Sequence, residues 1–96
     1  MSLQIEDSHR EILRRCLAPI SSDVFVFGSR SKGTAKPLSD LDLVIMGEVD
    51  KHLLSQVREG LEESNLPYKV DIVLWSEISA SFQNQIQRDL KLFDHT

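Results

Sequence analysis

Short apolar segments of strand-like composition alternate along this chain with stretches whose apolar residues recur at helical spacing. This alternation limits the possible folds more strongly than any other feature of the sequence. The strand-like segments are rich in β-branched and aromatic residues. They comprise residues 24–27, 41–46 and 68–75, and the helix-like stretches comprise residues 7–17, 50–64 and 76–93. The order α-β-loop-β-α-β-α predicts an α+β (mixed α/β) fold, a small mixed β-sheet with helices packed on one face. The direction of each strand cannot be read from this order.

The last helix-like stretch carries an apolar stripe that reaches almost to the end of the chain. Ser76 is its expected N-cap, and the apolar residues follow at helical spacing. The stripe consists of Ile78, Phe82, Ile86, Leu90 and Phe93. We expect these side chains to lie in the core or at an interface with a partner. Leu92 lies off the stripe and is a candidate exposed contact for an oligomer.

Composition excludes several classes of protein. At 96 residues, the chain is expected to form a single domain over residues 1–96. Its formal net charge is −4 and its Lys and Arg residues are scattered, so a long nucleic acid is a poor candidate for the partner. No apolar run approaches the roughly 20 residues of a membrane helix, and the N-terminus is too polar for a signal peptide. A single cysteine, Cys16, fits a reducing cytoplasm.

Acidic residues interrupt the apolar pattern in two of the strand-like segments. Side chains two positions apart in a strand share a face, so Asp40 and Asp42 are expected on one face and Leu41 on the other. Asp71 stands opposite the apolar residues of its own segment in the same way. If the two strands are neighbours, the three carboxylates converge and repel one another. A hard divalent ion such as Mg²⁺ explains such a cluster, and two ions can hold the attacking and leaving oxygens of a phosphoryl transfer.

Simpler explanations of these acids remain open at this point. An Asp-x-Asp pair often marks a strand end whose carboxylates are solvated, and Asp71 would then lie on the solvent-facing side of an antiparallel strand. The histidines offer no alternative metal site. His9, His52 and His95 share no metal-ligand spacing and are expected at the surface.

A polar loop follows the first strand-like segment and is expected to begin with a helical turn. Residues 28–33 start and end with glycine, which lets the backbone approach a phosphate group closely. Ser29 adds a hydroxyl donor, and Arg30 and Lys32 add positive charge. The spacing of the two glycines matches a Walker A loop, but Thr34 stands where that motif requires lysine, so the ATPase interpretation fails.

Gly28-Ser29, ten intervening residues and Asp40-Leu41-Asp42 together resemble the signature of the DNA polymerase β-like nucleotidyltransferase superfamily. The hydrophobic strand before this pattern and the aspartate of the third strand-like segment complete the resemblance. Size and element order are similar to those of the minimal nucleotidyltransferase (MNT) branch, whose small members are often paired with a helical HEPN-domain partner. The resemblance implies the fold of that superfamily's catalytic core.

The resemblance also implies roles for individual residues. Gly28 and Ser29 would hold the triphosphate of the nucleotide. Asp40 and Asp42 would ligate two Mg²⁺ ions, and Asp71 would ligate the catalytic ion and help to deprotonate the acceptor hydroxyl. The implied reaction is an in-line attack on the α-phosphorus with pyrophosphate as the leaving group, which depends on positioning and charge neutralisation.

Arg30 and Lys32 are further candidates for phosphate contact. The resemblance implies transfer of AMP from ATP to a hydroxyl group, most simply one on a HEPN-type partner protein of a toxin–antitoxin pair. Acceptor recognition would come from that partner, from a second copy in a homo- or hetero-oligomer, or from the target itself. Two alternatives remain open: a binding module that neutralises a HEPN partner by contact alone, and a transferase for a small molecule or a nucleic-acid end.

Overall fold

The computed structural model describes residues 3–95, which form a four-stranded sheet and the helices around it. The strands are β1 (Val24–Phe27), β2 (Leu41–Ile45), β3 (Val70–Leu74) and β4 (Lys91–Phe93). The α-helices are α1 (Asp7–Leu17), α2 (Ser29–Lys32), α3 (Lys51–Glu63) and α4 (Ala80–Ile86), and η1 (Trp75–Glu77) and η2 (Gln87–Asp89) are short 3₁₀ helices. The predicted α+β class is therefore confirmed. In the described part of the chain, no helix is long and apolar enough to cross a membrane.

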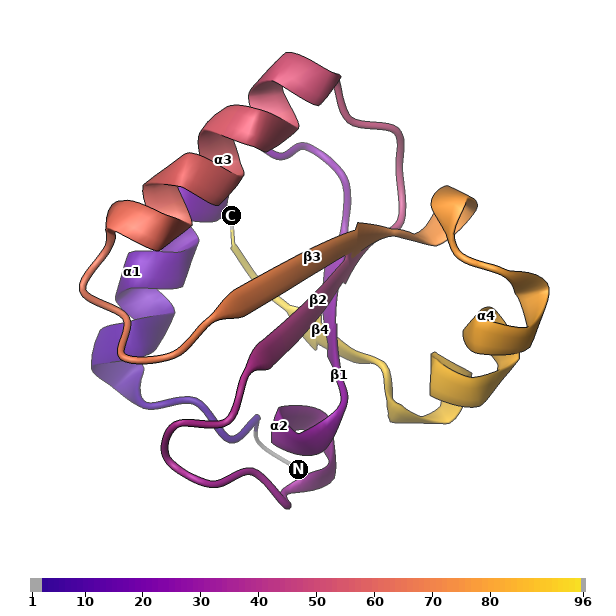
Figure 1. The fold of residues 1–96 in the computed structure, drawn as a ribbon, viewed down its shortest axis with the longest axis horizontal. Helices are drawn as coiled ribbons and strands as arrows, with labels where there is room; N and C mark the ends of the chain where they lie inside the picture. Colours follow the sequence, from indigo (N-terminus) through magenta and orange to yellow (C-terminus); the bar gives the residue numbers. More distant parts are fainter. Residues whose placement is uncertain (1–2, 96) are drawn as a thin grey trace.

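The sheet has the strand order β3-β2-β1-β4 (Figure 1). β1 runs antiparallel to both β2 and β4, whereas β2 and β3 run parallel. The parallel pair requires a long crossover connection, and α3 provides it between β2 and β3. This order gives β2 an interior position in the sheet and brings β3 directly beside it.

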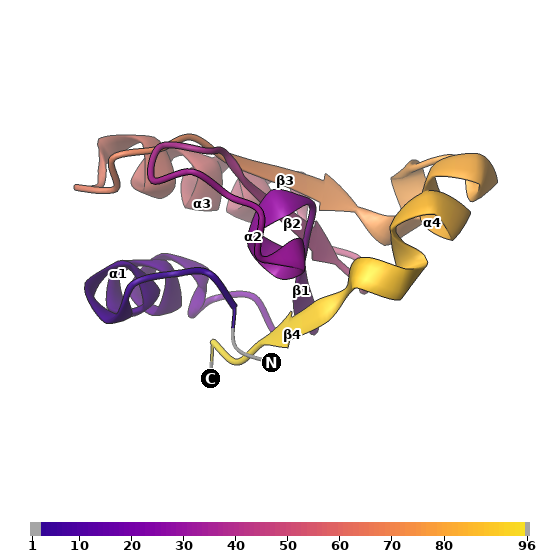
Figure 2. The same cartoon turned by 90° about the horizontal axis from the view of Figure 1, so that it is seen from below.

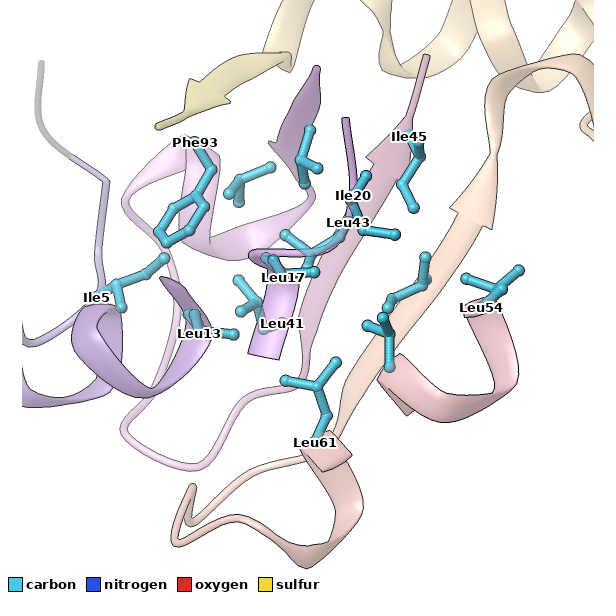
Figure 3. Packing of buried hydrophobic residues seen from close by; sticks show 14 of the residues in the cluster. Ile5, Leu13, Leu17, Ile20, Leu41, Leu43, Ile45, Leu54, Leu61 and Phe93 are labelled. Atoms are coloured by element: carbon cyan, nitrogen blue, oxygen red, sulfur yellow. The ribbon is translucent and has the colours of Figure 1, made fainter. Parts of the chain in front are cut away.

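α1 and α3 cover one face of the sheet and bury the larger core beneath them (Figure 2). Val26, Leu43 and Ile45 point from the sheet into this core and are fully buried. Helix residues such as Leu13 and Leu61 belong to the same cluster (Figure 3). The core fixes the register of β2, because a slip by one residue would turn the Asp42 side chain into the apolar layer.

The opposite face of the sheet carries a second, smaller apolar cluster built around Phe27, Val44 and Ile86. α4 packs over it, and the rings of Phe27 and Phe82 meet edge to face with their centroids 5.9 Å apart. The expectation that the helices pack on one face holds for α1 and α3 but is wrong for α4, which lies on the other side of the sheet (Figures 1 and 2).

The last helix is shorter than its apolar stripe predicts. It begins after Ser79, whose side chain accepts a hydrogen bond from the Phe82 amide at 3.1 Å, and not after Ser76. It ends at Ile86, and the chain continues through η2 into β4. Phe93 pairs with β1 and is buried. The spacing of the apolar residues fits both a long helix and this helix–turn–strand path, and the burial of Phe93 in the larger core decides between them.

Near the C-terminus, His95 is buried, which corrects its expected place at the surface. Its Nε2 lies 2.7 Å from the carbonyl oxygen of Ile20, so the segment after α1 supplies its polar partner. Leu92 is 55% exposed, as its position off the apolar stripe predicts. Alternate residues at this end of the chain therefore point into and out of the fold, as in any edge strand with one covered face.

Candidate functional site

Asp42 and Asp71 occupy directly paired positions on the parallel strands β2 and β3. Because their neighbours Leu43 and Ile72 are buried in the larger core, the two carboxylates project from the opposite face of the sheet. Both residues are half-buried. Burial, followed by the negative charges of Asp71 and Asp40, raises the pKa of the Asp42 carboxyl above its usual value. The structure thus brings acids from two strands together.

Asp40 lies on the loop immediately before β2 and is exposed, and its charge contributes to the raised pKa of Asp42. Within residues 3–95, no group of three His, Cys, Asp or Glu side chains is close enough to hold a metal ion by itself. Mg²⁺ in phosphoryl-transfer sites typically takes only one or two carboxylates and completes its shell with water and substrate phosphates. The donor chemistry of Asp40, Asp42 and Asp71 fits such an ion, because a cation would relieve the repulsion among these hard oxygen ligands.

Gly28 joins β1 to α2 and lies directly against Asp42. Its φ of +76° belongs to the left-handed region that favours glycine. A Cβ atom at this position would stand 2.6 Å from Oδ2 of Asp42, so a side chain here would force the carboxylate to move. The glycine turn therefore lies against the Asp42 member of the acidic pair.

Ser29 and Lys32 are the first and last residues of α2. Ser29 is half-buried at the glycine turn. The first amides of a helix have no partner inside it, and turns of this kind bind anions. The Lys32 side chain is 54% exposed, and its Nζ lies 3.6 Å from Oδ2 of Asp89. An exposed lysine in a weak surface pair can move toward a bound anion.

Arg30 has a different environment from the one that its sequence position suggests. It is only 5% exposed, and its guanidinium donates hydrogen bonds to the backbone carbonyl oxygens of Gln4, Pro37 and Ser39. It also stacks on the ring of Tyr68, with its central carbon 3.9 Å from the ring centroid. This placement argues against the expected phosphate contact, because the donors that would bind a phosphate are already engaged inside the protein.

Lys69 is a site residue that the sequence pattern did not single out. Its Nζ lies 3.4 Å from Oδ1 of Asp71. A signal was available, because residues two apart in extended backbone share a side, and Lys69 comes two positions before Asp71. An exposed ammonium group beside the acidic pair offers positive charge to an anionic ligand at this face of the sheet.

The chain is similar to known proteins over most of its length. A family model described as a nucleotidyltransferase domain matches residues 7–93. The chain is 37% identical over 90 residues to a probable protein adenylyltransferase, MntA, of Haemophilus influenzae, and the match covers 90% of this chain and 79% of that protein.

A solved structure, a toxin–antitoxin crystal structure with AMP-PNP, is similar in fold. Its TM-score is 0.69 at 23% sequence identity, and the match covers 91% of this chain and 73% of that one. At this level of identity the likeness shows a shared fold.

Proposed function

This chain belongs to the nucleotidyltransferase domain family, in its minimal (MNT) branch, and we propose that it transfers AMP from ATP to a hydroxyl group on a partner protein. A nucleotidyltransferase is an enzyme, and that much follows from the family. ATP as donor and a HEPN-type protein as acceptor draw on the relative named as a protein adenylyltransferase and on the toxin–antitoxin likeness. The observation that carries the proposal is the pairing of Asp42 with Asp71 against the Gly28 turn.

Two Mg²⁺ ions are the cofactor in this proposal. Asp40 and Asp42 would ligate both ions, and Asp71 would ligate the catalytic one. When bound, the ions would supply positive charge to the α-phosphate and to the departing pyrophosphate. The raised pKa of Asp42 supports this assignment, because a cation stabilises carboxylates that otherwise repel one another.

The residues of the chain carry out the remaining steps of the proposed reaction. The turn at Gly28 and Ser29 binds the triphosphate through backbone amides and the Ser29 hydroxyl, and Lys32 adds positive charge. Asp71 accepts the proton of the acceptor hydroxyl, whose oxygen forms a bond to the α-phosphorus. The bond between the α-phosphorus and the bridging oxygen breaks, and pyrophosphate leaves with that electron pair.

A partner protein fits the charge of the chain better than a nucleic acid does. With a formal net charge of −4, the chain lacks the overall positive charge that would attract the long phosphate backbone of a nucleic acid. The chain also spans 79% of the length of the adenylyltransferase relative, so the likeness covers most of that protein. In this proposal the reaction takes place in the cytoplasm, where a free cysteine such as Cys16 stays reduced.

A labelling experiment tests the proposal. The purified chain is incubated with the protein encoded by the neighbouring gene, Mg²⁺ and ATP labelled at the α-phosphate. We expect label on that protein, and we expect Asp42→Asn to reduce labelling by about 10³-fold. Asp23→Asn removes an exposed aspartate at the other end of β1 and is the matched control, with full activity expected.

The outcomes separate the alternatives. Labelling by the wild type and by Asp23→Asn, but not by Asp42→Asn, supports the transfer. If the partner stays unlabelled while Asp42→Asn binds it as tightly as the wild type does, the chain acts by contact alone and the transfer proposal is wrong. Label that appears only on an added nucleic acid or small molecule would reject the protein acceptor.

A further inference from the structure

Arg30 connects the glycine turn to the segment that carries the acidic residues. It belongs to α2, directly after Ser29. Its Nε and Nη2 donate to the Ser39 carbonyl oxygen at 3.1 and 2.8 Å, its Nη2 to that of Pro37 at 3.0 Å, and its Nη1 to that of Gln4 at 2.9 Å. A planar guanidinium can donate two hydrogen bonds to one carbonyl oxygen and further bonds to two others at the same time. The single ammonium group of lysine cannot reproduce this pattern.

The surroundings of Arg30 are built to hold its side chain. The guanidinium is stacked on the Tyr68 ring, and the ring of His9 meets that same ring edge to face with centroids 5.3 Å apart. Within residues 3–95 the buried Tyr68 hydroxyl has no hydrogen-bond partner, so Tyr68 contributes its ring face rather than its polar group. A buried cation enclosed in this way has one defined position, because leaving it would strand its carbonyl partners.

The bonds to Ser39 matter most because of where its carbonyl group lies. This carbonyl belongs to the planar peptide unit that joins Ser39 to Asp40, so orienting it restricts the backbone at Asp40. The turn before it is closed, since the Ser39 amide donates to the Lys36 carbonyl at 3.0 Å and the Lys36 amide donates to the Ser39 hydroxyl at 2.9 Å. On the other side of Asp40, the Leu41 amide donates to the Lys69 carbonyl at 2.9 Å. Asp40 is thus held between a closed turn and a paired strand.

The helix that carries Arg30 is itself anchored on its other side. Ser31 is 1% exposed and donates its hydroxyl to the carbonyl oxygen of Asp89. Lys91 donates its Nζ to the carbonyl oxygen of Ser31. Because η2 and β4 hold α2 in place, loss of the Arg30 bonds is expected to release the loop before Asp40 rather than α2.

We propose that Arg30 is a positioning residue for the transfer reaction, which sets the place of Asp40 relative to the turn at Gly28 and Ser29. This inference rests on the proposed function. Arg30 touches neither nucleotide nor ion in it and acts through the carbonyl oxygen of Ser39. The loop between the turn and the acidic pair is long enough to adopt many conformations, and the buried guanidinium at its start ties its end back to the turn.

Two conservative substitutions test the proposal. Arg30→Lys keeps the positive charge and removes the planar fork. Arg10→Lys is the matched control. The Arg10 guanidinium also donates to backbone carbonyl oxygens, those of Leu3 and Ile5, both at 3.3 Å, but these lie outside the loop that precedes Asp40. We expect Arg30→Lys to lower kcat for AMP transfer by about 30–100-fold while KM for ATP changes by less than about threefold. Arg10→Lys is expected to leave both constants within about twofold of the wild type.

Amide hydrogen exchange, followed by NMR on each protein without ligands, gives a readout that does not depend on activity. We expect the Ser39 and Leu41 amides to exchange at least about tenfold faster in Arg30→Lys, while the amides of β1 keep wild-type rates and show that the variant is folded. Arg10→Lys is expected to leave the Ser39 and Leu41 amides unchanged.

Each remaining outcome counts against the proposal in a recognisable way. A higher KM for ATP with unchanged kcat would replace the positioning role with a direct phosphate contact. Equal losses of kcat in Arg30→Lys and Arg10→Lys would mean that general destabilisation, and not positioning by Arg30, causes the loss of activity. If the wild type transfers no label but the exchange difference at Ser39 is present, the proposed function fails and the positioning role falls with it. If the wild type is active and Arg30→Lys changes neither readout, the positioning role alone is wrong.

Discussion

Asp42 and Asp71 lie side by side on adjacent parallel strands, and burial together with the charge of Asp71 raises the pKa of Asp42. The ionised form of Asp42 opposes folding, because burial and the neighbouring charge of Asp71 both disfavour it. Gly28 lies against the same carboxylate, and its lack of a side chain leaves room for it, since a Cβ atom there would stand 2.6 Å from Oδ2 of Asp42. An acidic pair that works against the stability of the fold and lies beside a glycine turn has the character of a functional site.

Replacing Asp42 with asparagine is expected to stabilise the fold at neutral pH. A carboxyl group whose pKa is raised on folding binds its proton more tightly in the folded state, so its penalty is fully present above the folded-state pKa and disappears below the unfolded value. We expect Asp42→Asn to raise the melting temperature by about 2–5 °C at about pH 7. The gain is expected to shrink as the pH falls and to approach zero at about pH 3, below the unfolded-state pKa. Thermal unfolding at both pH values measures the gain, with Asp23→Asn as control. A difference that does not change with pH would contradict the raised pKa of Asp42.

Mg²⁺ is expected to stabilise the wild type and not the Asp42→Asn variant. A ligand that binds only the folded state raises its stability, and removing one carboxylate removes the charge that attracts the ion. At about 10 mM Mg²⁺ we expect the wild-type melting temperature to rise by about 1–3 °C. Addition of a chelator reverses the shift. An equal rise in both proteins would place the ion elsewhere on the surface.

Alanine at Gly28 and at Gly33 separates the penalty of a positive φ from the crowding of Asp42. The two φ angles are +76° and +79°, but a Cβ at Gly28 would stand 2.6 Å from the Asp42 carboxylate, whereas one at Gly33 meets nothing within 4 Å. We expect Gly33→Ala to lower the free energy of unfolding by about 1 kcal/mol. Gly28→Ala is expected to lower it by about 2–3 kcal/mol and to abolish transfer. Urea unfolding measures both, and equal losses would mean that the carboxylate moves aside freely.

The start of α4 is tested by two serines. The Ser79 side chain accepts a hydrogen bond from the Phe82 amide at 3.1 Å, whereas Ser76 lies in η1 and makes no such cap. We expect Ser79→Ala to lower the free energy of unfolding by about 1 kcal/mol. Ser76→Ala is expected to change it by less than about 0.5 kcal/mol. The reverse order would restore the longer helix that begins at Ser76.

Neighbouring apolar residues test the terminal strand. Phe93 is 2% exposed and Leu92 is 55% exposed, as expected for successive residues of an edge strand. We expect Phe93→Ala to lower the free energy of unfolding by about 3–4 kcal/mol, and Leu92→Ala to change it by less than about 0.5 kcal/mol. Chemical unfolding of both variants measures this contrast. A large loss at Leu92 in the isolated protein would contradict its exposure.

The parts of the fold that were predictable depend on local signals. The first helix and the first strand begin and end where periodicity and composition predict, at 7–17 and 24–27. The Asp50 side chain accepts a hydrogen bond from the Leu53 amide at 3.2 Å, as its expected capping role requires. The terminal stripe predicts a longer helix than the structure has, because the same spacing of apolar residues is compatible with one helix or with a helix followed by a strand.

By itself, the sequence determined which side chains share a face and where the backbone turns sharply. Alternation in each strand assigned Asp42 and Asp71 to the side away from the apolar core, and Gly28 marked the turn, because both are properties of a few adjacent residues. Only the tertiary structure decided that β2 and β3 are parallel neighbours in the register that pairs the two acids. It also turned Arg30 inward, onto carbonyls that are distant in sequence. These relationships depend on contacts between segments far apart in the chain, and such contacts form only where burial of the whole core brings those segments together.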